Sequence, residues 1–308
     1  MKIIKKTAYL LLVLLCVSFL SFFLANISPI DPAEAYARRI SRSAGTELIA
    51  QYKKITGFDK TLPEQYWSWV KRAARLDFGV SYITKKDIRT ELCKALPATL
   101  TVAVCAAVFI IVFSVPLGIT AALNKGRFAD RLIGFFSFVS FSVPGYFAGL
   151  LCLRYFGMYL HWFPVIGHGH IVSVLFAAFV LALPMIGMLT RLLRSFLLEN
   201  EDKEYIQYAK ARGIGSRHIM TRHLLRNAAP VLLTLWGQNI GYLIAGTAIA
   251  ESIFSIPGIG IYALNAAINR DFPVINAYLV LTAFAFVVCN GAAEFLGAAL
   301  NPLLRNRA

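Results

Sequence analysis

The chain has 308 residues, of which 58% are hydrophobic and 15% are charged, and its mean hydropathy is +0.63. A soluble domain carries about 25% charged residues, and here the apolar residues form continuous blocks of about 20, enough to cross a bilayer. The net charge of +15 would suggest nucleic acid in a soluble domain. Lys and Arg lie in the loops, however, where they set topology and contact anionic lipid. The composition therefore predicts an all-α polytopic membrane protein in a lipid bilayer, with no nucleic-acid partner.

The first apolar block covers residues 7–27 and follows three lysines. Its uncharged run is longer than that of a typical signal peptide and no A-x-A cleavage site follows, which favours an uncleaved transmembrane helix. The lysines would hold its N-terminus in the cytoplasm. The polar segment 28–96 is then extracytoplasmic, and its apolar spacing predicts a short amphipathic helix over 62–70 with Pro63 in the first turn.

Five further apolar blocks lie within residues 97–302. They cover about 97–123, 132–158, 173–193, 229–250 and 275–300. Residues 142–145, Ser-Val-Pro-Gly, interrupt the second of these blocks and predict a bent helix. The short connections on one side hold many Lys and Arg, whereas the two short loops on the other side hold Arg270 alone. This asymmetry predicts six transmembrane helices with both termini in the cytoplasm.

The longest predicted inner connection, residues 199–228, is polar and is named here the 199–228 loop. Residues 204–212 suit a helix that carries Tyr205, Tyr208 and Ala209 on one face, and Gly213 would end it. Ser216 would begin a second short helix that ends near residue 226. The pattern fits either a docking surface for an energy-supplying protein or a basic loop on anionic lipid.

The stretch 208–213, Tyr-Ala-Lys-Ala-Arg-Gly, followed after nine residues by His-Leu-Leu at 223–225, resembles the EAA loop of ABC importer permeases. Gln207 and Arg226 depart from the Glu and the Pro of that consensus. The chain is most similar to the nickel and di-/oligopeptide branch of the family. Further segments carry the likeness, at 58–66, 76–81, 96–100, 114–118, 190–194, 256–260 and 270–274.

The resemblance implies a type I ABC importer (MetI-like) permease fold in the cell inner membrane, with an extracytoplasmic insert after helix 1. It also implies a second homologous permease subunit, two cytoplasmic ABC ATPase subunits and an extracytoplasmic substrate-binding protein as partners. In that family the EAA loop fits a cleft of the ATPase and transmits its motion. The predicted ATPase-coupling residues here are Tyr205, Tyr208, Ala209, Ala211, Gly213, Ile219 and His223.

No G-x-x-x-x-G-K-[ST] phosphate-binding motif occurs in the sequence, and no set of residues suits hydrolytic catalysis. We therefore expect a transport subunit that is not an enzyme and carries no cofactor, with ATP hydrolysed by its partners. Residues 270–275 and 287–290 look more like nickel permeases than peptide permeases. The predicted function is half of a translocation pathway for nickel or a metal chelate. Di- or oligopeptide import is the first alternative, and an ion-coupled secondary transporter, which usually shows internal repeats, is the second.

Polar residues within the apolar blocks are candidates for the pathway. Gln238, Asn239 and Glu294 could contact substrate, although bonding between helices is the commoner role. Glu251, at the end of a block, is a further candidate because carboxylates at membrane depth are often functional. The predicted outer loop carries three histidines, His161, His168 and His170, which could receive a metal ion or be ordinary polar residues. No metal site is firmly predicted.

Overall fold

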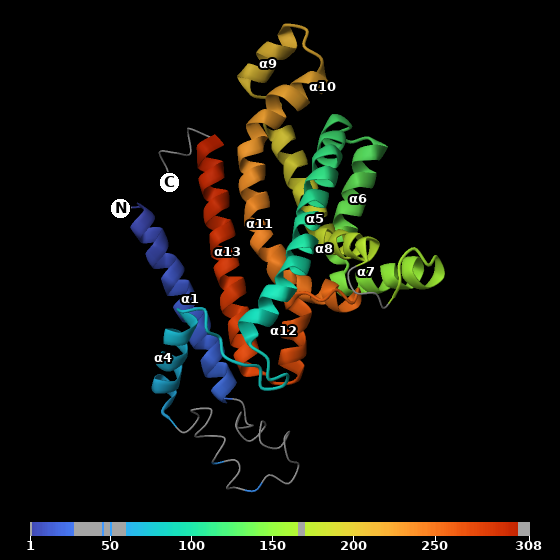
Figure 1. The fold of residues 1–308 in the computed structure, drawn as a ribbon. Helices are drawn as coiled ribbons and strands as arrows, with labels where there is room; N and C mark the ends of the chain where they lie inside the picture. The colour runs from blue at the N-terminus through green and yellow to red at the C-terminus, as the bar shows by residue number, and fades with distance from the viewer. Residues whose placement is uncertain (1, 28–44, 46–49, 51–59, 166–169, 301–308) are drawn as a thin grey trace. The chain divides into compact units, whose positions relative to one another are not determined.

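The computed structural model describes residues 2–27, 45, 50, 60–165 and 170–300 (Figure 1). These residues form helices, and Val80 and Asp87 make one isolated antiparallel bridge. The helices are α1 (Lys2–Ile27), α4 (Leu62–Ala73), α5 (Ile88–Leu123), α6 (Phe128–Ser142), α7 (Gly145–Cys152), α8 (Ile171–Glu199), α9 (Glu204–Ala211), α10 (Ser216–His218), α11 (Leu225–Ile253), α12 (Ile259–Ile268) and α13 (Phe272–Leu300). Two π-helices continue them, η1 (Leu153–Tyr159) and η2 (Ile219–Leu224).

The chain divides into two compact units. The first unit is Met1–Pro97 with Ile261–Ala285, and the second unit is Ala98–Gly260 with Phe286–Ala308. By length and apolar composition, three helices of the described chain could each cross a membrane, namely α5, α8 and the Phe272–Ala293 part of α13. A fourth span results if α6 and the following Gly145–Tyr159 helix are counted together. The total of six transmembrane helices stays a prediction.

The predicted bend after residue 142 is confirmed. The two halves of this broken span meet at an angle of 101°. Helix α6 stops at Ser142 because Val143, directly before Pro144, is extended with φ −78° and ψ 123°. A proline ring disfavours the helical conformation of the residue before it, so the helix can restart only beyond the proline, at Gly145.

In the first unit, helix α5 begins earlier than residue 97, where its apolar block starts. Asp87 caps the helix by accepting hydrogen bonds from the Thr90 hydroxyl at 2.6 Å and the Thr90 backbone N–H at 2.8 Å. The Thr90 hydroxyl and backbone bonds hold the pKa of the Asp87 carboxyl below its ordinary value. The length of the apolar block corresponds to the thickness of the membrane, whereas the Asp87 cap determines where α5 begins.

The first unit also shows that the described part of the predicted insert is folded. Helix α4 has Pro63 in its first turn, as predicted, and the Tyr66 hydroxyl lies 2.9 Å from the Ser18 hydroxyl of α1. Asp271, which is 2% exposed, accepts hydrogen bonds from the Ser81 hydroxyl at 2.5 Å and the Tyr82 N–H at 3.0 Å. Segment 76–87 is thereby fixed to the turn before α13.

In the second unit, glycines bring helices into close contact. Gly187 of α8 packs on Ser137 and Ser140 of α6, and Gly241 of α11 packs on Phe286. Small residues at such positions let helix backbones approach closely, which is a main source of association between helices in membranes. The two helices that flank the 199–228 loop are therefore closely packed at Gly187 of α8 and at Gly241 of α11.

Candidate partner-docking site and pathway residues

Helix α9 forms the first half of the predicted helix-turn-helix. It is followed by Gly213 with φ +78°, a left-handed conformation that favours glycine. The Gly213 N–H donates to the Lys210 carbonyl at 2.9 Å, and the Ile214 N–H donates to the Ala209 carbonyl at 3.2 Å. The predicted helix and its glycine turn are confirmed.

The second predicted helix is not a separate element. Helix α10 begins at Ser216, passes into the π-helix η2 at Ile219 and continues as α11. The predicted end near residue 226 is wrong. Polar side chains in front of an apolar block do not by themselves end a helix, so the helical backbone continues into α11. Pro230 lies inside α11, and the Thr234 hydroxyl donates to its carbonyl at 2.9 Å. The 199–228 loop is consequently joined to α11 without a break.

An apolar cluster supports the loop from below. Its members come from the ends of α5 and α8, from α9, and from η2 with the start of α11. They are Ala122, Leu193, Leu197, Ile206, Ala209, Ile219, Met220, Leu224 and Ala228, all buried. Ile206 and Leu224 are both 0% exposed. Helix α9 therefore shares a closely packed apolar cluster with the ends of three long helices.

The outward face of α9 carries the aromatic residues. Tyr205 is 41% exposed and Tyr208 is 68% exposed, and the Arg212 guanidinium lies 5.9 Å from the centre of the Tyr208 ring. Of the other predicted coupling residues, Ala211 and Gly213 are exposed and His223 is half-buried. Ala209 and Ile219 are buried beneath this face. The structure thus places these two residues in the support of the surface instead of on it.

An ion pair fixes the end of α8 just before the loop. Arg194 donates from Nε to Asp130 Oδ1 at 2.6 Å and from Nη2 to Asp130 Oδ2 at 2.8 Å. The Gly126 N–H also donates to Asp130 Oδ2, at 2.9 Å. Two parallel charge-assisted bonds define the orientation of both side chains. The start of α6 and the end of α8 are held together there.

The predicted pathway residues fall into different environments. Gln238 is exposed on α11, on the same face as Tyr242, which is 55% exposed. Asn239 donates from Nδ2 to the Leu235 carbonyl of its own helix at 2.7 Å. Glu294 lies in α13, but its side chain is outside the described part of the structure. Between residues 231 and 250, the polar side chains that α11 exposes are therefore those of Gln238 and Tyr242.

Glu251 is fully buried and holds a turn. Its Oε1 accepts a 2.5 Å bond from the Thr99 hydroxyl, which in turn accepts a 2.8 Å bond from the Ile259 N–H. A Cβ on Gly258 would lie 2.3 Å from Glu251 Oε1, and one on Gly260 would lie 2.5 Å from the Ala248 backbone. The absence of side chains at the two glycines therefore leaves the space that the carboxylate occupies. The hydrogen bonds from Ile259 to Thr99 and from Thr99 to Glu251 fix the turn that follows α11.

Removing the Thr99 hydroxyl, which links Ile259 to Glu251, tests how much these hydrogen bonds stabilise the protein. Thr99→Val keeps the shape of the side chain but leaves the buried Ile259 N–H without its acceptor. We expect the free energy of unfolding to fall by about 1–3 kcal/mol, measured as thermal unfolding in detergent. Thr120→Val is the matched control in α5, because the exposed Thr120 hydroxyl bonds only within its own helix. Equal unfolding temperatures for the two variants would contradict the role of Thr99.

The candidate metal-receiving histidines are only partly described. His161 and His170 line one pocket of about 580 Å³ together with Trp162 and Phe163. His161 has φ +52°, and its Nδ1 lies 3.2 Å from the Tyr159 carbonyl. His168 lies outside the described residues. Within the described chain no group of three or more His, Cys, Asp or Glu could hold a metal ion, so metal hand-over stays a hypothesis.

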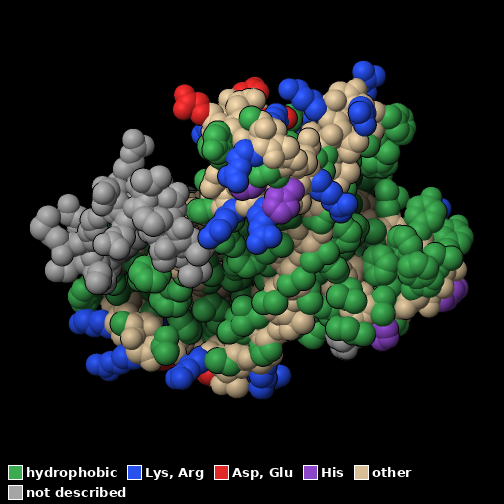
Figure 2. Space-filling view, turned by 90° about the horizontal axis from the view of Figure 1, so that it is seen from above, with side chains coloured by type: hydrophobic (Ala, Val, Ile, Leu, Met, Phe, Trp, Pro, Cys, Tyr) green, Lys and Arg blue, Asp and Glu red, His purple; other side chains and the backbone are tan. Residues whose placement is uncertain are grey.

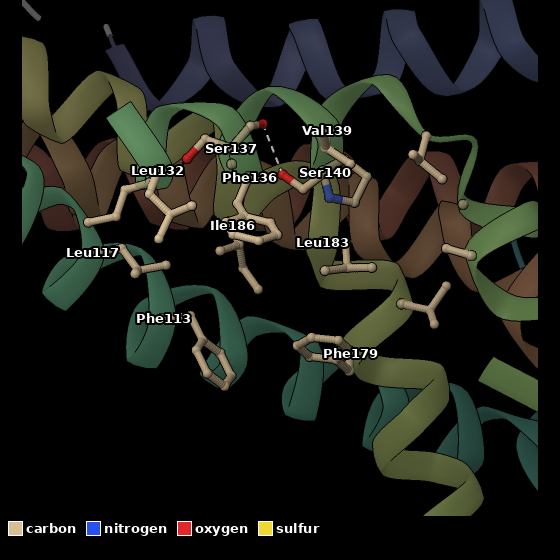
Figure 3. A pocket seen from close by; sticks show the side chains of 17 residues that line it. Phe113, Leu117, Leu132, Phe136, Ser137, Val139, Ser140, Phe179, Leu183 and Ile186 are labelled. Atoms are coloured by element: carbon tan, nitrogen blue, oxygen red, sulfur yellow. Dashed lines mark hydrogen bonds between the residues drawn. The ribbon is translucent and has the colours of Figure 1, made fainter. Parts of the chain in front are cut away.

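An apolar cavity of about 550 Å³ lies between α5, α6, α7 and α8 (Figure 3). Figure 3 shows Phe113 and Phe179 on one side of it and Phe136 on the other. Its hydroxyls belong to Ser137 and Ser140, and the Ser140 hydroxyl donates to the Ser137 carbonyl at 3.0 Å. No charged residue lines it. The cavity suits apolar groups and has no chemistry for binding a metal ion or a peptide backbone.

Long apolar helices that could cross a membrane, with a helical loop packed on the ends of two of them, define a polytopic helical membrane protein. Residues 114–306 match the family described as binding-protein-dependent transport system inner membrane component. Residues 1–103 match the N-terminal part of such membrane components. The chain therefore belongs to this family of ABC importer permeases, and the predicted family is confirmed.

Two relatives extend over nearly the whole chain. The metal-staphylopine import system permease protein CntB of Staphylococcus aureus (strain NCTC 8325 / PS 47) is 32% identical, covering 99% of this chain and 98% of the relative. The glutathione transport system permease protein GsiC of Escherichia coli (strain K12) is 28% identical, covering 98% of each. The solved inward-facing MetNI methionine ABC transporter has a similar fold, with a TM-score of 0.58 and 18% identity over 68% of this chain and 96% of that chain.

These comparisons establish an ABC importer permease with a MetI-like fold. Such a subunit is a transport component instead of a catalyst, and its family implies an ATPase and a substrate-binding protein as partners. The second alternative, an ion-coupled secondary transporter, is not retained, because this family depends on binding proteins.

Proposed function

We propose that this chain forms one half of a translocation pathway for a metal chelate, with nickel among the metals carried. A second homologous permease supplies the other half, and two cytoplasmic ATPase subunits drive transport. Both termini lie in the cytoplasm, residues 97–302 form the permease domain, and residues 28–96 form an extracytoplasmic insert. The 32% identity over 99% of the chain with a permease named for metal-staphylopine import supports this substrate class.

The observation that carries the coupling role is that one face of α9 is buried and the opposite face is exposed. Ile206 is 0% exposed on one side, and Tyr208 is 68% exposed on the other. We propose that Tyr205 and Tyr208 contact the ATPase, with Ala211, Gly213 and His223 in the same surface. Ala209 and Ile219 support that surface. Exposed aromatic residues on a firmly packed helix suit the centre of an interface, because they bring a large contact area with few rotatable bonds.

Uptake measurements test the substrate. Cells with and without the protein would be given radiolabelled nickel alone, radiolabelled nickel with excess histidine, and a labelled dipeptide. We expect uptake of the nickel chelate to require the protein and uptake of the dipeptide to be unchanged. The reverse result would establish the peptide alternative, which the 28% identity with a glutathione permease favours.

A further inference from the structure

A basic pocket lies on the 199–228 loop, between α9, α10, η2 and the start of α11. It measures about 430 Å³ and is lined by Tyr205, His218, Arg222, His223, Arg226 and Asn227. The His218 and His223 rings lie 6.0 Å apart, and Asn227 Nδ2 donates to the Tyr205 hydroxyl at 3.0 Å. Figure 2, seen from the side of α9 and α10, shows Lys, Arg and His side chains gathered on this face. The pocket has fixed walls and carries no carboxylate.

The charges around the pocket are unbalanced. The acidic residues of the loop lie at its start, at or before Glu204, and none lies between Tyr205 and Ala228. Glu201 is paired with Lys210 at 3.0 Å and is therefore committed elsewhere. Among the described residues, no carboxylate forms an ion pair with Arg222 or Arg226. Two guanidinium groups that share one hollow repel each other, and an anion between them would remove that repulsion.

Two departures from the EAA consensus bear on this pocket. Gln207 is neutral where the consensus has Glu, and Arg226 is a cation where the consensus has Pro. Both changes make the loop more positive, and Arg226 lines the pocket itself. The partner surface that fits this loop must therefore be correspondingly acidic.

We propose that the pocket receives an Asp or Glu side chain of the ATPase that docks on the 199–228 loop. The proposal rests on the docking role proposed above and adds the chemistry of recognition. Guanidinium groups bind carboxylates through paired parallel bonds, and neighbouring hydroxyl and amide groups complete such a site. Tyr205 belongs both to this pocket and to the exposed aromatic face of α9. A carboxylate held there would adjoin the aromatic contacts.

The position of the pocket favours a protein partner over a lipid headgroup. Helices α9 and α10 project beyond the adjoining end of α11 (Figure 1). Tyr205 and His218 belong to these two helices, so part of the pocket wall lies beyond the end of α11. The attraction of a basic residue to anionic lipid falls off within about one Debye length of that surface, roughly 8–10 Å.

The test compares Arg222→Gln/Arg226→Gln with Arg217→Gln. Arg217 is an exposed cation of α10 that does not line the pocket, so Arg217→Gln controls for the loss of one of the two positive charges that the double variant removes. Each permease would be co-produced with the ATPase subunits of its own transport system, and retention of the ATPase in detergent would be measured at increasing NaCl. We expect about tenfold weaker binding for the double variant at ~0.1 M salt, a smaller difference at high salt, and near wild-type binding for Arg217→Gln.

Other outcomes separate the two proposals. If wild type binds the ATPase and the double variant binds it equally well at every salt concentration, the carboxylate pocket is refuted while the docking role stands. If wild type binds no ATPase, the docking role itself fails. Binding to vesicles with and without anionic lipid, in the absence of the ATPase, gives the third arm. A lipid-binding loss in the double variant with unchanged ATPase binding would assign the pocket to headgroups and overturn the proposal.

Charge reversal supplies a second measurement. Arg226→Glu should abolish ATP-driven uptake, and selection for restored uptake should yield acidic-to-basic substitutions in the ATPase. Suppressors confined to the permease helices would argue against a carboxylate from the partner.

Discussion

Replacing Gly187 with alanine should strongly reduce the amount of folded permease. A Cβ at this position of α8 would lie 2.2 Å from the Ser140 hydroxyl oxygen and 2.5 Å from the Ser137 backbone carbonyl. A hydroxyl can rotate, but the carbonyl belongs to the backbone of α6 and cannot move by itself. The two helices must separate, and overpacking of this kind costs about 1–3 kcal/mol or more. Gly187→Val should be worse.

The measurement is the yield of monodisperse protein by size-exclusion chromatography, together with thermal unfolding in detergent. Gly134→Ala in α6 is the matched control, since a Cβ there would meet nothing within 4 Å. Adding Ser140→Ala to Gly187→Ala should restore only part of the loss, because the Ser137 carbonyl remains. Similar stability of Gly187→Ala and Gly134→Ala would show that α6 and α8 are not packed as described.

Tyr208→Ala should strongly reduce ATP-driven transport and leave the permease folded. The side chain is 68% exposed, so its removal leaves no cavity in the protein. If Tyr208 lies at the centre of the ATPase interface, its truncation should reduce the binding free energy by about 2 kcal/mol or more, which is over tenfold in affinity. Uptake, ATPase retention and thermal unfolding would be measured on the same preparations.

Ile206→Ala is the informative comparison in the same helix. Ile206 is 0% exposed in the cluster beneath the loop, so its truncation should lower stability by about 2–5 kcal/mol. We expect loss of both fold and transport for Ile206→Ala, and of transport alone for Tyr208→Ala. If Tyr208→Ala supports uptake at the wild-type rate, the proposal that α9 contacts the ATPase through Tyr208 is refuted.

A substitution at Gly213 is a less decisive test of whether α9 contacts the ATPase. With φ +78°, any residue other than glycine is strained there by about 1–2 kcal/mol, whether or not a partner docks. Gly213→Glu would therefore confound backbone strain with lost contact, and Tyr208 separates the two effects.

Local features of the sequence predicted much of this fold. Continuous apolar blocks indicated the long helices, Pro144 indicated the broken span, and Gly213 indicated the turn after α9. Each depends on residues that are neighbours in the chain. The start of α5 at Ile88 was missed because a cap, not the apolar block, determines it. The continuity of η2 with α11 was missed because the apolar block that starts at residue 229 was taken as a separate helix.

The candidate site was predicted less completely, because burial depends on tertiary contacts. Helical spacing placed Ala209 beside Tyr205 and Tyr208, but packing on α8 and η2 buried it. Glu251 was recognisable as a carboxylate at membrane depth, yet its partner Thr99 lies 152 residues away in the sequence. No periodicity connects residues so far apart.

Because η2 continues into α11 without a break, a small tilt at the loop would produce a larger displacement at the far end of α11. Helix α11 has 29 residues, so as one rod it is about 44 Å long. A tilt of about 5° at the loop would swing the far end by about 4 Å, if the rod stays straight. That far end carries Glu251, whose bond to Thr99 ties it to α5. If a docked partner displaces α9, we expect the far end of α11 to move sideways against the Glu251–Thr99 hydrogen bond.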